Sequence, residues 1–260
     1  LSGFKEDIVL LAEERFAMIL DLLAQKRSAT VLELCDALDA SESTIRRDLT
    51  QLDRQGLLKK VHGGATLVGH TVLADEPPMA AREEQSVEEK RLIARAAAAM
   101  ITEKDFVFLD AGSTTLALAA ALEGPALQAA YVTNGIAHAR MLVQKGCRTY
   151  LPGGQVRPIT EAITGPETLA ALQHYNFTKA FMGANGVSPA EGFTTPDPEE
   201  ASIKTAALQR ARERWFLVDN TKFDMVYSAV IGDIGCGAIL TNHCPDPRYA
   251  QLTFVKECSV

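Results

Sequence analysis

From residue 106 onward the sequence alternates short β-prone runs with helical patterns, and this alternation constrains the fold more than any other feature. The β-prone runs are residues 106–109, 130–132, 149–151, 179–182 and 215–218. Helical patterns separate them, beginning at Thr114 and Ile136, near Glu167, and at Glu199. Strands that alternate with helices pair in parallel, because each helix carries the chain back across the sheet. We therefore predict an α/β fold with a mainly parallel sheet covered by helices.

The N-terminal part has a different pattern, with three short amphipathic helices at residues 13–26, 31–38 and 42–55. Thr30 with Glu33 forms a capping-box signature for the second helix, and Ser41 is placed to cap the third. Gly56 is expected to end that helix. Residues 57–67 are β-prone around Gly63-Gly64 and predict a small hairpin, or wing.

Length and this change of pattern divide the chain into two domains. At 260 residues the protein exceeds the usual size of one compact domain. The helices and hairpin occupy residues 12–68, and a polar, Pro-containing linker is expected at residues 69–86. Residues 87–260 form the second domain, which opens with an Ala-rich helical pattern at residues 87–101.

Composition narrows the class of protein. No segment approaches ~18 uncharged apolar residues, and the first residues lack the pattern of a signal peptide, so we expect a cytoplasmic protein with no membrane partner. The five cysteines form no C-x-x-C pair, and we expect no disulfide framework, metal or cofactor. The net charge of −7 argues against nucleic-acid binding, but residues 42–62 hold five basic and three acidic side chains. Positive charge is concentrated where DNA binding requires it.

The third helical pattern begins with polar and basic side chains, while its apolar residues lie on the other side. The N-terminal group comprises Ser41, Ser43, Thr44, Arg46 and Arg47. A helix seated in a major groove presents such side chains to base edges and phosphates. Arg46 and Arg47 lie about 100° apart around the helix, so one is expected to read guanine and the other to hold the backbone, and the sequence does not say which.

The hairpin adds groups suited to the flanking DNA backbone or minor groove. They are Lys59, Lys60, His62 and Gly63. A solvated surface explains the third helix alone equally well. The order of two helices, a Ser/Thr/Arg helix and a basic hairpin with glycines instead favours a winged helix-turn-helix that binds DNA.

In the second domain, a loop with the composition of a phosphate site follows the first strand and opens a helix. Its residues are Asp110, Ala111, Gly112, Ser113, Thr114 and Thr115. Glycine lets the backbone approach an anion, and the hydroxyls and free N–H groups at the helix start donate to it. A tight turn with an N-cap serine is the alternative for this loop taken alone.

Four more polar or glycine clusters follow predicted strands. They contain Asn134, Gly153 and Gly154, Asn185 and Gly186, and Asp219. Carboxyl ends of parallel strands share one edge of the sheet, where ligands bind. Lys222 is the better candidate to meet an anion there, while Lys204 either faces a ligand or forms an exposed i,i+4 pair with Glu200.

The motifs together closely resemble the DeoR family of bacterial sugar-metabolism regulators. The N-terminal ones are S-T-I-R-R-D-L at residues 43–49, Leu57-Leu58 and V-H-G-G-A at residues 61–65. The later ones are D-A-G-S-T-T, V-T-N, L-P-G-G, G-A-N-G, F-T-T-P-D-P-E-E-A-x-I-K and D-x-x-K-F, so the resemblance extends from Glu13 to Asn242.

This resemblance implies that the helix from Ser43 is the recognition helix of a repressor of a carbohydrate operon. It also implies an effector domain similar in fold to ribose 5-phosphate isomerase and the CoA transferases. The sugar-phosphate site carried over comprises Asp110, Gly112, Ser113, Thr114, Asn134, Gly153, Gly154, Asn185, Gly186, Glu200, Lys204 and Lys222. Asn220-Thr221 departs from the family's common His-Ser pair, which leaves the contribution of Asn220 to ligand choice open.

Two classes of function fit such a crevice. One is a repressor whose partners are operator DNA and a phosphorylated sugar, acting as a homo-oligomer (dimer or tetramer) because helix-turn-helix proteins usually pair to match two half-sites. The other is an isomerase-like enzyme, in which carboxylates and lysines move protons next to a carbonyl. An isomerase has no need of a wing and an Arg-Arg helix, so we expect the regulator and assign no catalytic residue.

Overall fold

A computed structural model of the chain describes residues 12–26, 28–61, 63–67, 72–73 and 78–258. The chain forms two compact units, residues 1–71 and residues 72–260. Within the described residues, no helix is both long and apolar enough to cross a membrane.

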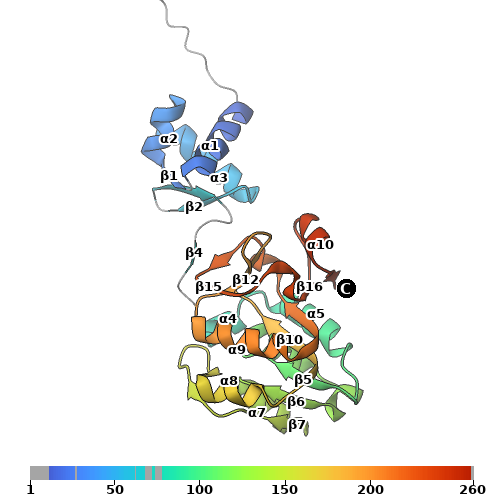
Figure 1. Cartoon of the computed structure of the whole chain (residues 1–260). Coiled ribbons are helices and arrows are strands. Elements are labelled where there is room, and N and C mark those ends of the chain that lie inside the picture. Colours follow the sequence, from blue (N-terminus) through green and yellow to red (C-terminus); the bar gives the residue numbers. More distant parts are fainter. Residues whose placement is uncertain (1–11, 27, 62, 68–71, 74–77, 259–260) are drawn as a thin grey trace, which may run out of the picture. The chain divides into compact units, whose positions relative to one another are not determined.

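The first unit is a winged helix-turn-helix, as the sequence predicts (Figure 1). Its helices are α1 (Ala12–Lys26), α2 (Val31–Leu38) and α3 (Glu42–Arg54). Its strands are β1 (Ser28–Thr30), β2 (Leu58–Val61) and β3 (Gly64–Leu67), which form an antiparallel sheet in the order β1-β3-β2. The apolar stripes of the three helices meet in one fully buried core, formed by Ile19, Leu23, Leu34, Ile45, Leu49 and Leu52.

Local signals in the sequence set the ends of these helices. Thr30 and Glu33 form the predicted capping box of α2, and the Ser41 side chain accepts a hydrogen bond from Thr44 N at the start of α3. Gly56, at a φ of +72°, follows α3 in the left-handed conformation that glycine adopts without strain. The three caps predicted from sequence are confirmed.

The second unit contains the predicted parallel sheet, in the order β17-β16-β13-β10-β5-β6-β7. Every neighbouring pair in it is parallel. The strands are β5 (Phe106–Leu109), β6 (Ala130–Thr133), β7 (Arg148–Tyr150), β10 (Phe177–Gly183), β13 (Ala211–Leu217), β16 (Ala238–Thr241) and β17 (Val255–Glu257).

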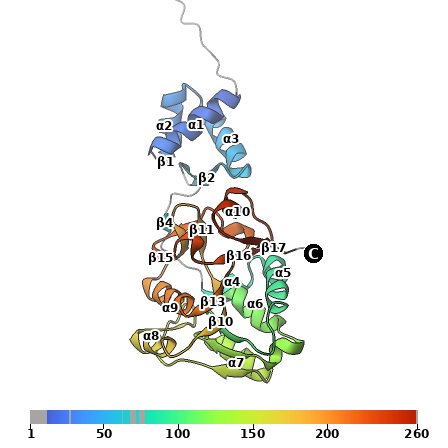
Figure 2. The same cartoon turned by 45° about the vertical axis from the view of Figure 1, so that its right-hand side comes forward.

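Helices cover both faces of this sheet, as Figure 2 shows for α9 on one side and for α5 and α6 on the other. One layer holds α5 (Val87–Ala98), α6 (Ser113–Ala121) and α7 (Ile136–Gln144); the other holds α8 (Pro166–Leu172) and α9 (Pro198–Gln209). Side chains alternate along each strand, so Val107 and Leu109 enter the first apolar layer and Phe108 enters the second. The helix predicted at residues 87–101 ends at Ala98.

Shorter elements surround the sheet. They are β4 (Val72–Leu73), α4 (Met79–Glu83), η1 (Gly124–Gln128), β8 (Gln155–Val156), β9 (Ile163–Thr164), β11 (Gly186–Ser188), β12 (Gly192–Thr195), η2 (Asn220–Lys222), β14 (Val226–Tyr227), β15 (Ala229–Gly232), η3 (Ile234–Cys236) and α10 (Arg248–Leu252). Both β4, which pairs with β14, and α4 lie in the segment that the sequence assigns to a linker. The compact second unit begins at Val72.

Strand order creates a switch point between β5 and β10. From β5 the chain builds outward through β6 to β7, whereas from β10 it builds in the opposite direction through β13 and β16 to β17. The loops that follow β5 and β10 therefore leave the sheet toward opposite sides. A crevice opens between such loops at the carboxyl ends of the strands, where open α/β sheets bind their ligands.

Candidate functional site

A small polar crevice lies at this switch point. The loop after β5, the loop after β10, α9, η2 and the segment from Arg82 to Lys90 line it. Eight of the residues predicted from sequence are present: Asp110, Gly112, Ser113, Thr114, Asn185, Glu200, Lys204 and Lys222. The structure thus brings together groups that are more than a hundred residues apart in the chain.

The N-terminus of α6 faces this crevice without a side-chain cap. Gly112 is the N-cap residue, and no side chain accepts a hydrogen bond from the first turn. Because the first N–H groups of a helix have no partner within the helix, they are available to an anion, which the helix dipole also favours. Ser113 and Thr114 add hydroxyl groups at the same edge.

Three buried side chains hold the loop from behind. Thr115 Oγ1 lies 2.6 Å from the Asp110 carbonyl oxygen and 2.8 Å from that of Gly112. Asn134 accepts from Ala111 N at 3.0 Å. His138 Nε2 lies 3.1 Å from both Thr115 Oγ1 and the Gly112 carbonyl oxygen. Thr115, Asn134 and His138 therefore shape the loop and are absent from the lining of the crevice.

His138 is a neutral ring in this position. Burial lowers its pKa from 6.5 to about 4, against the opposing attraction of Asp110. Sequence reasoning did not single out His138. The position of His138 on the buried side of a predicted helix could have pointed to it. A buried histidine needs a polar partner, and the preceding phosphate-type loop supplies one.

The floor of the crevice is a buried ion pair between Lys204 and Asp110. Asp110 Oδ2 also accepts from Gly183 N at 2.9 Å, which ties the loop after β5 to the end of β10. Lys204 is 4% exposed, so the alternative of an exposed surface pair with Glu200 is excluded. The lysine reaches the crevice, and its charge is balanced there by Asp110.

Glu200 is bound on its other side to the segment between β8 and β9. Its Oε1 accepts from Thr160 Oγ1 at 2.5 Å and lies 3.1 Å from Arg157 Nε. Arg157 also pairs with Asp197, the N-cap residue of α9. Glu200 therefore lines the crevice and also holds a neighbouring loop.

Two cations at the rim differ in how they are held. Lys222 is partly buried, and within the described residues its ammonium has no hydrogen-bond or ion-pair partner. Lys90 is 5% exposed and donates to the carbonyl oxygens of Arg82 and Gln85. Burial lowers the pKa of Lys90, and the nearby charges of Lys222 and Arg82 lower it further while Asp219 opposes them.

Lys90 was missed from sequence, although a signal for it exists. It shares the spacing i, i+3, i+4, i+7 with Ile93, Ala94 and Ala97, which are all fully buried. A lysine within the apolar stripe of a helix needs carbonyl or anionic partners. In an Ala-rich helix with several charged residues, Lys90 looks like an ordinary surface lysine.

Several predicted site residues lie away from the crevice lining. Gly153 is exposed, and its carbonyl accepts from Thr168 Oγ1 at 2.8 Å. A Cβ at Gly154 would lie 2.4 Å from the Thr164 carbonyl oxygen, and one at Gly186 would lie 2.1 Å from that of Met225. Gly154 and Gly186 therefore allow backbones to pack closely, whereas a Cβ at Gly153 would meet nothing within 4 Å.

Asn220, where the sequence departs from the family pattern, is exposed and also lies outside the lining. Its side-chain oxygen accepts from Asn242 Nδ2 at 3.0 Å, and its N–H donates to Asn242 Oδ1 at 2.9 Å. These two bonds join η2 to the end of β16.

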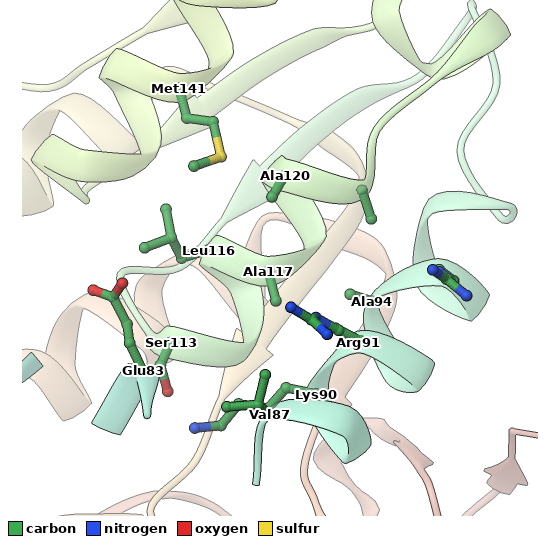
Figure 3. A pocket seen from close by; sticks show the side chains of 12 residues that line it. Glu83, Val87, Lys90, Arg91, Ala94, Ser113, Leu116, Ala117, Ala120 and Met141 are labelled. Carbon is green, nitrogen blue, oxygen red and sulfur yellow. The ribbon is translucent and has the colours of Figure 1, made fainter. Parts of the chain in front are cut away.

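A second hollow adjoins the crevice between α5, α6 and α7 (Figure 3). The two share Lys90 and Ser113, but aliphatic side chains such as Leu116, Ala117 and Met141 dominate the second one. Arg91 and Arg95 also line the hollow, so cations are present in both spaces.

In the first unit, α3 presents its N-terminal side chains to solvent. The Ser41 hydroxyl lies 3.0 Å from that of Ser43 and 2.9 Å from that of Thr44. Arg46 forms an exposed pair with Glu42 at 3.2 Å. Arg47 is exposed, and no side-chain partner lies near it in the described part of the chain. Arg47 is therefore the arginine that can meet DNA without first breaking an ion pair.

A partly buried ion pair fixes the orientation of this helix. Arg15 in α1 donates to both carboxylate oxygens of Asp48, at 2.8 and 3.3 Å. Asp48 is 4% exposed. A bidentate guanidinium–carboxylate contact restrains the relative orientation of the two groups as well as their distance. It therefore holds α3 against α1 at a set angle.

The wing carries its basic residues on β2. Lys60 Nζ donates to Thr50 Oγ1 at 2.7 Å, and Lys60 N donates to Asp53 Oδ1 at 2.9 Å, so this residue is tied to α3. Lys59 is exposed. Gly63 at the turn has a φ of +88° and accepts from Val31 N at 2.8 Å. The predicted contact residue His62 lies outside the described residues.

Comparison with known proteins decides the family. The profile of the DeoR-like helix-turn-helix domain matches residues 15–71, and that of the DeoR C-terminal sensor domain matches residues 85–241. The chain belongs to the DeoR family. Members of the DeoR family named as transcriptional regulators match it over most of their length, which supports a DNA-binding regulator and not the isomerase-like alternative.

Two of these DeoR-family relatives illustrate the match. A protein of Bacillus subtilis described as the uncharacterized HTH-type transcriptional regulator FruR is 38% identical over 95% of this chain and 98% of that protein. The lactose phosphotransferase system repressor of Streptococcus mutans is 34% identical over 81% of this chain and 83% of that protein. Among solved structures, ribose 5-phosphate isomerase A of Methanocaldococcus jannaschii aligns with 54% of this chain and 55% of that chain, at 14% identity and a TM-score of 0.40.

Proposed function

We propose that this DeoR-family regulator represses a carbohydrate-utilisation operon and that a phosphorylated sugar bound in the crevice changes its affinity for operator DNA. Residues 1–71 bind the DNA and the second unit binds the effector. The observation that carries the effector proposal is the uncapped N-terminus of α6, with Lys222 and Lys90 lining the same crevice.

Charge balance in the crevice favours a phosphate over a neutral sugar. Asp110 already compensates Lys204 at the floor, whereas the Lys222 ammonium has no partner in the described part of the chain. A phosphate at the start of α6 supplies the missing negative charge and accepts from the helix N–H groups. Asn185, Glu200 and Thr114 are then placed to contact sugar hydroxyls.

A thermal-shift assay with paired ligands tests this proposal. Phosphorylated sugars should raise the melting temperature at concentrations where the same unphosphorylated sugars do not, because only the former fill the anion site. Stabilisation by unphosphorylated sugars alone would contradict the phosphate site.

The substitution Lys222→Met tests the contribution of one residue to the proposed phosphate site. Losing a charge-assisted contact is expected to weaken binding of the stabilising sugar phosphate by about tenfold or more. Lys104→Met, which removes an exposed lysine outside the crevice lining, is the matched control and should leave the affinity unchanged. Equal affinity of the two variants would remove Lys222 from the site.

For DNA, we propose that the first turns of α3 read base edges and that Lys59 and Lys60 contact the backbone, in a homo-oligomer that spans two half-sites. Arg47→Ala should weaken operator binding about tenfold or more in a gel-shift assay, because a bidentate base contact is worth about 1–3 kcal/mol. Its melting temperature should not fall, since Arg47 is exposed.

Arg54→Ala is the control on the same helix, because Arg54 lies in the last turn of α3, away from the end that enters the groove. It should change operator affinity much less than Arg47→Ala does. Unchanged affinity on replacing Arg47 would count against its role in DNA reading.

A further inference from the structure

Helix α4 is held at its end by Lys90, which lines the crevice, and at its start by a loop that is bound to another lining residue, Glu200. At its start, Met79 N donates to the Ile159 carbonyl oxygen at 3.0 Å. The neighbouring Thr160 is fastened to Glu200 by a hydrogen bond of 2.5 Å. At its end, Lys90 binds the carbonyl oxygens of Arg82 and Gln85, the latter at 2.7 Å.

These contacts matter because α4 is a short helix. It is five residues long, its N-cap Pro78 makes no side-chain cap bond, and only Met79 of its side chains is buried. Helices this short are not stable by themselves. The Lys90 ammonium and the loop bound to Glu200 therefore contribute to the order of α4, together with its packing on α6.

Lys90 is also placed to respond to an anion. An ammonium has three N–H donors, and two of those on Lys90 are used by the carbonyls at the end of α4. The same side chain lines the crevice together with Gly112 and Ser113 at the start of α6. It is repelled by Lys222 and Arg82 and attracted by Asp219 and Glu83.

We propose that Lys90 senses the effector, donating its remaining N–H to the phosphate at the start of α6 and thereby fixing α4 in place. This inference rests on the phosphate site proposed above. The negative charge of the phosphate offsets the repulsion between Lys90 and Lys222. This stabilises the charged form of Lys90 and strengthens its hydrogen bonds to the two carbonyl oxygens. By linkage, an ordered α4 in turn favours the bound anion.

The position of α4 in the chain gives this contact a regulatory consequence. Only residues 72–78 separate it from the DNA-binding unit that ends at Thr71. Strand β4, which lies within these residues, is paired with β14, so an effector that fixes α4 acts on the segment that leads from the DNA-binding unit into the second unit. Lys90 thus connects effector binding to this segment.

Amide hydrogen exchange with inorganic phosphate as the probe tests the anion site and the α4 contact separately. Amides at the start of α6, residues 113–116, report the anion site. The N–H groups of Met79, Arg82 and Gln85, which all have hydrogen-bond partners, report α4. We expect saturating phosphate to slow exchange about tenfold at both places in the full-length wild-type chain.

Lys90→Met should keep the phosphate-dependent protection at residues 113–116, at a higher phosphate concentration, and lose it at residues 79–85. Arg91→Met, which removes an exposed cation of the same helix that pairs with Glu88, should keep both. Protection of α6 without protection of α4 in the wild type overturns the role of Lys90 and leaves the anion site standing. Absence of protection at both places overturns the anion site and the inference together.

Discussion

The crevice shows, at the scale of single residues, a division between groups that face a ligand and groups that shape the backbone behind it. His138, Thr115 and Asn134 all contact the loop that carries Gly112, so they fix the direction of its N–H groups. We expect that replacing any of them alters effector binding through the shape of the loop.

The protonation of His138 should make the stability of the second unit depend on pH. Its pKa is about 4 in the folded protein and 6.5 when unperturbed, so the unfolded state binds more protons between these values. The contribution is fully present above about pH 6.5 and is lost as the pH falls toward 4. Between pH 7 and pH 5 the free energy of unfolding should fall by about 2 kcal/mol from this residue.

Denaturant unfolding at the two pH values checks this, with His138→Gln as the comparison because it lacks the titrating ring. The wild type should lose about 2 kcal/mol more than the variant does. Parallel pH dependence of the two proteins would show that His138 is not buried as a neutral ring.

At the scale of single residues, the sequence identified those whose type and position indicate their chemistry. Gly112, Ser113 and Lys222 follow strands and carry phosphate-suited groups, and the structure places all three in the crevice. It could not place Lys90, whose partners are backbone carbonyls without a sequence signature. Nor could it separate Gly154, which serves backbone packing, from a ligand-facing glycine.

Among the elements, the wing depends on two adjacent glycines that have different physical roles. Gly63 has a φ of +88° but open space around a Cβ, whereas a Cβ at Gly64 would lie 2.2 Å from the Ala29 carbonyl oxygen. The first glycine serves the turn and the second lets β3 pass close to β1. One dipeptide motif thus meets two separate requirements.

Two alanine substitutions should separate these requirements. Gly63→Ala is expected to cost about 1 kcal/mol, because the cost is backbone strain alone. Gly64→Ala should cost about 3 kcal/mol or more, because a side chain there meets backbone that cannot yield without moving β1. Urea unfolding of the two variants measures the difference, and equal losses would contradict the assigned roles.

Long, periodic elements were predictable, and short ones were not. Strands β5, β6, β7, β10 and β13 and the longer helices of both units follow clear periodicities, so the sequence places them within a few residues, whereas β16 and β17 of the same sheet were not predicted. By contrast, β4 and α4 have two and five residues, too few to show a period. They exist because β14 and Lys90 hold them, and those partners are distant in the sequence.

For the whole molecule, the distribution of charge matters more than its sum. The first 71 residues hold nine Lys or Arg against eleven Asp or Glu, a net charge of −2. The DNA-binding unit therefore has no general attraction for phosphate backbones. Its affinity must come from the few cations placed on α3 and β2.

This arrangement predicts a limited salt dependence of operator binding. Each phosphate contact contributes about 0.9 to the slope of log affinity against log salt concentration. Lys59→Ala should lower the magnitude of that slope by about 1 for each bound chain and weaken binding to all sequences alike. Fluorescence anisotropy at several salt concentrations measures it, and an unchanged slope would show that Lys59 does not contact the backbone.

The switch point between β5 and β10 has a consequence for how this architecture changes over evolutionary time. The proposed phosphate anchor at Gly112 follows β5, whereas Asn185, which is proposed to contact sugar hydroxyls, follows β10. Under the proposed function, the anchor for the phosphate and the surface that distinguishes one sugar from another are therefore inherited on separate segments. We expect substitutions near Asn185 in a duplicated gene to change which sugar is bound while the segment that holds the phosphate is retained.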